Sequence, residues 1–239
     1  MTRAADRTVG RDVAPDGLGQ PAAEFLLSLP RHRHDLSREQ VRASQRGRIA
    51  LATADVVAGE GYAGATVLAI AKRAGVSRKT FYELFADKEE ALLAAYDGLD
   101  HLIEQTVRAA ADSASSGGTA RELLAAGTTA LLATLAEQPA FTRMFFLEAL
   151  GAGPRVRERR DQAIEQAAEP LALALTLVRR SQDARLPPVS HELARALTGA
   201  GIEAIIRHLV NHEPETLDQL APELNRIIDQ IVLPQPNPR

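Results

Sequence analysis

Cysteine is absent from the 239 residues, and no apolar run approaches the roughly 18 to 20 residues that a membrane span requires. The first absence excludes a disulfide framework, a thiolate zinc site and a cysteine nucleophile. Arg3, Arg7 and Arg11 precede no apolar run, so the N-terminus does not have the form of a signal peptide. These absences predict a cytoplasmic protein that has no membrane partner.

Motifs of catalysis and metal binding are also missing. The nucleophile elbow G-x-S-x-G, the zinc motif H-E-x-x-H, the P-loop and the Glu-x-x-His of di-iron bundles do not occur. His208 and His212 have i, i+4 spacing, but a pair alone is more typical of solvated or interface side chains than of a metal site. We therefore expect no metal, no cofactor and no enzymatic activity. The enzyme alternative would need an acid/base or metal cluster within 112–233, and the sequence shows none there.

Helix signals dominate the sequence, and no window has the β-branched alternation of a strand, so the predicted fold class is all-α. Ser37 and Gln40 have capping-box spacing and predict a helix start near Arg38. Gly59 and Gly61 are expected to stop this first helix. Three further helices are predicted over 67–74 after Thr66, over 78–85 after Ser77, and from Asp87 to about Ala111.

Charge is divided unevenly along the chain. Residues 37–88 hold nine Lys and Arg against five Asp and Glu, a net charge of +4. Residues 89–239 hold 14 against 21, a net charge of −7. A basic module followed by a larger acidic one is expected when only one part of a protein meets a polyanion.

The segment 67–86 has the spacing of a helix-turn-helix. Ala71 is small where two helices cross, and Gly75 allows a left-handed turn without steric strain. Val76, Phe81 and Leu84 fill the wedge between the helices, and the second helix of such a motif lies in the major groove of DNA. The alternative is an ordinary helical corner with solvated cations. The side chains left outside, suited to phosphates and base edges, are Arg78, Lys79, Thr80 and Tyr82.

The stretch GATVLAIAKRAGVSRKTFYELFADKEEAL (64–92) resembles the DNA-binding module of the TetR (tetracycline repressor) family, and the resemblance extends over about 37–95. It implies that Thr66, Arg78, Lys79, Thr80 and Tyr82 contact DNA and that Lys88 binds a phosphate. Composition, helix signals and this resemblance together predict four parts: a flexible or disordered arm (1–36), the helix-turn-helix domain (37–88), a helical ligand-binding and dimerisation domain (89–233) and a disordered tail (234–239).

The larger domain contains an aromatic cluster beside one of only two methionines: Phe141, Met144, Phe145 and Phe146. Adaptable apolar side chains suit a pocket for a small apolar ligand, and ordinary core packing is the alternative. His101, Arg143, Glu148 and Arg179 are candidate polar anchors for such a ligand.

Two apolar helices are expected near the end of the chain, over about 190–211 and 215–232. The resemblance implies that they form an isologous four-helix dimer interface. Ala204, Ile205 and Leu209 lie on the apolar stripe of the first of these helices. The alternative is that this stripe covers only the core of its own domain.

The resemblance implies a transcriptional repressor that binds a palindromic double-stranded DNA operator as a homodimer and is released by a small apolar effector. The alternative is a DNA-binding or partner-binding module without an inducer. Just before the first helix, RHRHDLSR (31–38) is predicted to add phosphate or minor-groove contacts, and a solvated linker is the alternative.

Overall fold

The computed structural model describes residues 37–114 and 117–232, and all regular secondary structure in these ranges is helical, as predicted. The predicted arm (1–36) and tail (234–239) lie outside the described residues. No described helix is long and apolar enough to cross a membrane. The helices are α2 (Arg38–Gly64), α3 (Val67–Ala74), α4 (Arg78–Leu84), α5 (Lys88–Ala114), α6 (Ala120–Ala136), α7 (Pro139–Arg143), η1 (Met144–Glu148), η2 (Ala149–Gly151), α8 (Pro154–Gln182), α9 (His191–Asn211), η3 (Pro214–Leu220) and α10 (Ala221–Val232).

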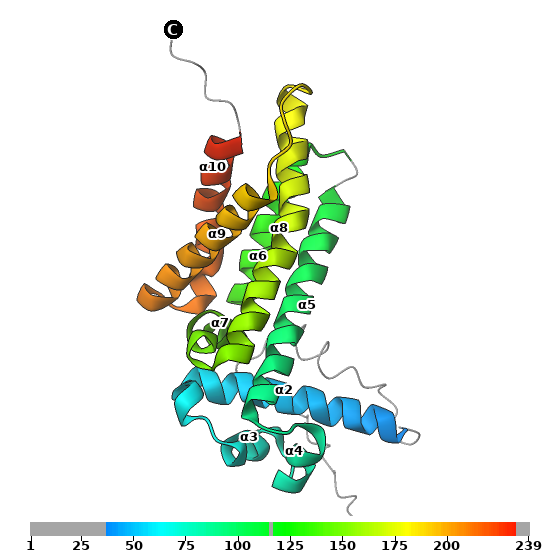
Figure 1. Cartoon of the computed structure of the whole chain (residues 1–239), viewed down its shortest axis with the longest axis vertical. Helices are drawn as coiled ribbons and strands as arrows, with labels where there is room; N and C mark the ends of the chain where they lie inside the picture. Colours follow the sequence, from blue (N-terminus) through cyan, green and yellow to red (C-terminus); the bar gives the residue numbers. More distant parts are fainter. Residues whose placement is uncertain (1–36, 115–116, 233–239) are drawn as a thin grey trace, which may run out of the picture.

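The molecule is elongated, with α2, α3 and α4 at one end (Figure 1). Helices α5, α6 and α8 run along its length, and α9 and α10 lie along one side, far from α4. Helix α5 begins beside α4 and continues to the opposite end of the molecule. It therefore belongs both to the end formed by α2, α3 and α4 and to the larger helical part of the molecule.

The predicted helix starts are confirmed by side-chain caps. Ser37 and Gln40 form a reciprocal capping box, with hydrogen bonds of 2.8 and 3.2 Å between them. Thr66 and Ser77 accept hydrogen bonds from backbone N–H groups at the starts of α3 and α4. These caps are local in sequence, which is why the sequence predicts them well.

Helix α2 differs from its predicted end. It continues past Gly59 to Gly64, with a kink at Gly61, whose φ is 72° and ψ is 159°. This conformation is not helical, so it interrupts the helix at one residue. It is accessible essentially only to glycine. One further turn follows, closed by a 3.0 Å hydrogen bond from Ala65 N to Gly61 O.

A small core holds the helix-turn-helix together. Phe81 of α4 is fully buried against Ile70 and Ala71 of α3 and against Ile49 of α2. Gly75 has the predicted left-handed conformation, with φ of 65° and ψ of 35°. The core continues into Ala91 and other residues of the first turns of α5, so α5 packs directly on the motif.

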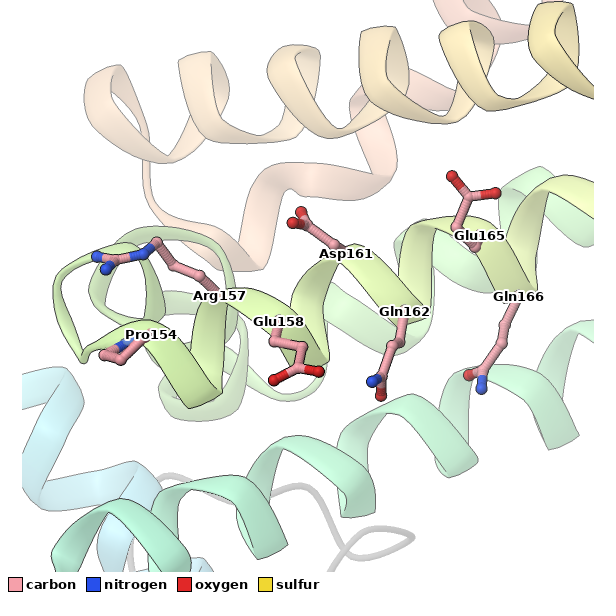
Figure 2. Close-up of a pocket in the computed structure, with 7 residues that line it drawn as sticks. All are labelled: Pro154, Arg157, Glu158, Asp161, Gln162, Glu165 and Gln166. Carbon is pink, nitrogen blue, oxygen red and sulfur yellow. The ribbon is translucent and has the colours of Figure 1, made fainter.

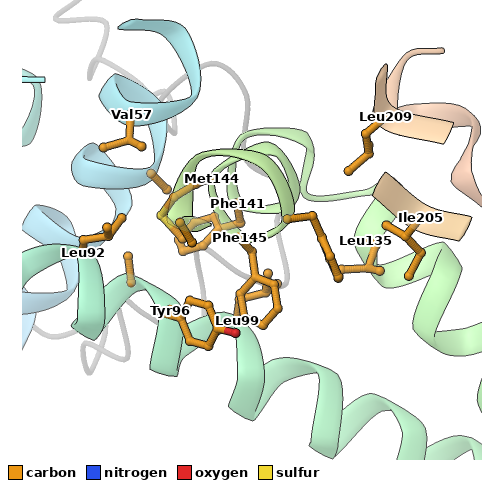
Figure 3. Close-up of a cluster of buried hydrophobic side chains, with 14 of the residues drawn as sticks. Val57, Leu92, Tyr96, Leu99, Leu135, Phe141, Met144, Phe145, Ile205 and Leu209 are labelled. Carbon is orange, nitrogen blue, oxygen red and sulfur yellow. The ribbon is translucent and has the colours of Figure 1, made fainter. Parts of the chain in front are cut away.

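The main core lies between the two ends of the molecule (Figure 3). Val57 of α2 and Leu92 of α5 pack in this core with Phe141 of α7 and Met144 of η1. Because α2 contributes to this core as well as to the core of the helix-turn-helix, apolar packing is shared between the helix-turn-helix and the larger helical part of the molecule.

Candidate nucleic-acid interface

Helix α4 presents cationic and aromatic side chains on its outer surface. Arg78 is exposed, the Lys79 side chain is 87% exposed, and Tyr82 is 52% exposed although its neighbour Phe81 is fully buried. Glu83 lies 3.9 Å from Lys79, one turn along the same face. Such an exposed ion pair contributes little to stability, so Lys79 is available to an anionic partner.

The two predicted threonine contacts also serve as parts of the motif. Thr66 is exposed at the start of α3, where its hydroxyl accepts the N–H of Ala69 at 3.1 Å. Thr80 is half-buried, and its hydroxyl lies 2.9 Å from that of Ser77, which caps α4. Both hydroxyls lie near the predicted DNA-facing surface, but each already has a partner within the protein.

Two arginines of α2, which the sequence analysis did not identify, hold the C-terminal end of α4. Arg46 donates to Leu84 O at 2.8 Å, and Arg42 donates to Glu83 O at 3.3 Å. The Arg46 guanidinium also lies 4.2 Å from the centroid of the Phe85 ring. These cations satisfy carbonyls at the negative end of the helix dipole, so they fix the orientation of α4.

Lys88 points into the protein rather than outward. Its Nζ donates to Tyr62 O at 2.7 Å and to Ala65 O at 2.9 Å, and it lies 4.4 Å from the centroid of the Tyr62 ring. Two of its three ammonium donors therefore stabilise the end of α2. The sequence predicts a phosphate contact for Lys88, but it could not reveal these carbonyls 23 and 26 residues earlier.

The predicted ligand-binding side chains Phe141, Met144, Phe145 and Phe146 are all buried and belong to the main core. Phe145 stacks on Tyr96 of α5, with ring centroids 3.8 Å apart (Figure 3). Burial, and then the nearby Asp100, raise the pKa of the Tyr96 hydroxyl well above its usual range. A ligand that enters here must separate side chains that are packed together in this structure.

Three of the four candidate polar anchors have partners other than this cluster. Arg143 lies 3.8 Å from Glu213, and His101 pairs with Gln105 one turn away at 2.9 Å. Glu148 instead accepts the backbone N–H of Tyr62 at 3.2 Å. It is therefore directed towards the end of α2.

The predicted dimer residues lie mostly inside the chain. Ile205 and Leu209 are buried in the main core, and Figure 3 shows both side chains directed toward it. Ala204 is only half-buried. Ile205 and Leu209 therefore pack within their own subunit, and their apolar stripe covers the core of their own domain.

Two surface grooves lie outside the aromatic cluster. The larger, about 670 Å³, follows α8 and has a polar lining (Figure 2). Asp161 and Glu165 point toward α9, and Gln162 and Gln166 point toward α5. The smaller groove, about 380 Å³, has residues of α2, α3 and α7 in its lining. Neither groove is lined by the aromatic side chains that the sequence proposes for ligand binding.

The histidine pair near the end of α9 is held by local contacts. The rings of His208 and His212 are 4.8 Å apart, and Nε2 of His208 lies 2.8 Å from the Thr216 hydroxyl. Burial, and then the nearby His212, lower the pKa of His208. Within 37–114 and 117–232, no group of three or more His, Asp or Glu side chains is arranged to hold a metal ion.

Comparisons with known proteins agree with this geometry. Residues 49–95 match the family model described as bacterial regulatory proteins, tetR family. No curated protein matches the chain. Similar solved structures include the fatty acid degradation regulator FadR from Bacillus halodurans, at 20% identity and a TM-score of 0.64, covering 77% of this chain and 94% of that one.

Two further solved structures extend the likeness. FadR from Bacillus subtilis, solved in complex with stearoyl-CoA, is 22% identical with a TM-score of 0.62, covering 76% of this chain and 96% of that one. A tetR-family regulatory protein from Rhodococcus RHA1 is 21% identical with a TM-score of 0.60, covering 77% and 96%. The helix-turn-helix region of this chain therefore matches the tetR family model, and the fold of most of the chain is similar to that of these solved regulators.

Proposed function

We propose that the chain is a cytoplasmic repressor that binds a palindromic operator as a homodimer and is released by an apolar ligand. The observation that carries DNA binding is the outer face of α4, where Arg78, Lys79 and Tyr82 are exposed on a helix fixed by buried Phe81. Exposed cations and a flat aromatic on a rigid helix are suited to phosphates and base edges. The −7 charge of residues 89–239 supports placing the DNA on this end alone.

Lys79→Ala and Tyr82→Ala are each expected to weaken operator binding by about 1 to 3 kcal/mol if a base contact is lost. Both side chains are exposed, so the fold should be retained. The measurement is a titration of a fluorescent operator, first selected by the wild-type protein from random duplexes. Arg185→Ala is the control, because it removes one exposed positive charge after the end of α8. Equal affinities for Lys79→Ala, Tyr82→Ala and wild type would rule out this docking of α4.

We place the dimer face on α8 and α9. Leu173 and Leu177 occupy successive turns of α8 and are 63% and 52% exposed. On α9, Ala196 is exposed, and a Cβ added to Gly199 would meet no atom within 4 Å. Exposed leucines beside small residues allow two helices to approach closely, and two copies joined there would give the isologous contact of a symmetric dimer. The second copy of the chain is the partner that matches a two-fold operator.

For the ligand we propose a molecule with a long acyl chain. Two observations support this class. The cluster of Phe141, Met144, Phe145 and Phe146 is apolar, and FadR from Bacillus subtilis, which has a similar fold, is solved in complex with stearoyl-CoA. Stearoyl-CoA is expected to release the protein from its operator and to raise its melting temperature, because a ligand that prefers one conformation shifts the population toward it. Coenzyme A without an acyl chain should do neither.

Competition in the operator titration, combined with thermal melting, decides between the two regulatory models. If stearoyl-CoA and free stearate change neither operator affinity nor melting temperature, acyl-chain induction is contradicted. That result would favour the alternative of a DNA-binding module without an inducer, for which the close packing of Phe145 on Tyr96 is the supporting observation.

A further inference from the structure

The kink at the end of α2 is held by a side chain from the larger domain. Glu148 Oε2 accepts the backbone N–H of Tyr62 at 3.2 Å, across 86 positions of sequence. This N–H directly follows Gly61, the residue that leaves helical geometry. A carboxylate that accepts a backbone N–H makes a charge-assisted hydrogen bond, which is among the stronger kinds in proteins.

Gly61 suits this contact in two independent ways. Its φ of 72° lies in a region that side chains other than glycine rarely adopt. In addition, a Cβ added there would lie 3.3 Å from the same Glu148 oxygen. The backbone at this position is therefore fitted to the approach of the carboxylate.

Lys88 holds the same peptide segment by its carbonyl oxygens. Its ammonium group donates to the carbonyl oxygens of Tyr62 and Ala65, so Tyr62 is bound through its N–H by Glu148 and through its C=O by Lys88. The next residue, Thr66, caps α3. The position of the segment 62–65 therefore sets where α3 begins, and α4 packs on α3.

Glu148 is the last residue of η1, a π-helical turn that also contains Phe145 and Phe146. Turns of this kind are rare and occur frequently at functional sites. Phe145 stacks on Tyr96 of α5 at 3.8 Å, so η1 packs on α5 by its aromatic rings and binds α2 by its terminal carboxylate. A displacement of the rings would move the carboxylate with them.

We infer that Glu148 is the positioning residue that couples η1 to the DNA-reading helices. This inference rests on the proposed function. With Glu148 bound to Tyr62, the end of α2 is held in the conformation that presents α3 and α4. Opening the aromatic cluster withdraws the carboxylate, and the Tyr62 N–H then loses this charge-assisted hydrogen bond.

The test compares Glu148→Ala and Glu148→Gln with wild type, and Glu158→Ala on α8 serves as a control for the loss of one acidic group. With the operator selected by wild type, Glu148→Ala is expected to bind about tenfold more weakly. Glu148→Gln keeps an acceptor oxygen and should recover most of that loss. Hydrogen exchange at the Tyr62 amide should become faster in Glu148→Ala and remain slow in Glu158→Ala.

Coupling between two sites acts in both directions, which gives a second measurement that a purely structural role of Glu148 would not affect. If η1 affects operator binding, operator binding must affect η1, so the amides of 145–148 should exchange more slowly when operator is added to wild type. This protection should be absent in Glu148→Ala. Should that variant fail to fold, the wild-type experiment still decides, because no protection of η1 by operator would overturn the inference.

The outcomes separate the inference from the proposed function. If wild type selects an operator and Glu148→Ala binds it with the same affinity, the coupling role is overturned, whereas the proposed function is not. A wild-type protein that selects no DNA site would overturn both. Slower exchange of η1 upon operator binding, lost in Glu148→Ala and retained in Glu158→Ala, supports both.

Discussion

Leu177→Glu is expected to convert the protein into monomers that bind the operator about 10²- to 10⁴-fold more weakly than wild type. Leu177 is 52% exposed on α8, one turn from Leu173, and we place it at the centre of the face that meets the second copy. A glutamate there would be desolvated against an apolar surface without a partner. Without the dimer, each half-site is bound independently, and the advantage of joined half-sites is lost.

Sedimentation velocity and operator titration measure the two parts of this expectation. Leu150→Glu is the matched control, because it introduces the same charge at another exposed leucine, in η2. Leu150→Glu should remain dimeric and retain wild-type operator affinity. A dimer that persists in Leu177→Glu at micromolar concentration would place the interface on another face.

Leu209→Glu is expected to unfold the protein rather than to separate its subunits. Leu209 is 3% exposed and packs in the main core, although its position on the apolar stripe of α9 predicts a dimer contact. A carboxylate in this core would be buried without a counter-ion, so the free energy of unfolding should fall by at least about 4 kcal/mol. The expected result is a large drop in the denaturant midpoint or failure to accumulate as soluble protein.

The next residue supplies the control for this variant. Val210 is 69% exposed, so Val210→Glu should change the free energy of unfolding by less than about 0.5 kcal/mol. Circular dichroism during urea unfolding compares the two variants. A folded, monomeric Leu209→Glu with a wild-type midpoint would restore Leu209 to the dimer face.

The features that the sequence predicts well depend on neighbours in the chain. Ser37, Thr66 and Ser77 cap their helices from three residues away, and Gly75 adopts the turn conformation that its position implies. The packing of Phe81 in the helix-turn-helix follows from spacing within about twenty residues. Here local propensity and tertiary structure agree, so pattern alone is sufficient.

The features that the sequence misses depend on distant partners. Arg42 and Arg46 bind carbonyls about 40 residues away, and Lys88 reaches back to the end of α2. An apolar stripe such as that of Ile205 and Leu209 predicts burial but does not identify the surface that buries it. Distinguishing a core contact from a subunit contact requires the position of every neighbouring helix, which periodicity along a single helix does not contain.

The way in which α4 is held has a consequence for how its outer face can vary. Ser77 fixes its first turn, Arg42 and Arg46 fix its last, and Phe81 anchors its inner side. The side chains at 78, 79 and 82 are exposed, and the Tyr82 ring touches the support only by an edge contact with Phe81. If these side chains read DNA as we propose, mutations at the three positions change the preferred base sequence while the fold is retained, and a duplicated gene could acquire a new set of targets through a few surface substitutions.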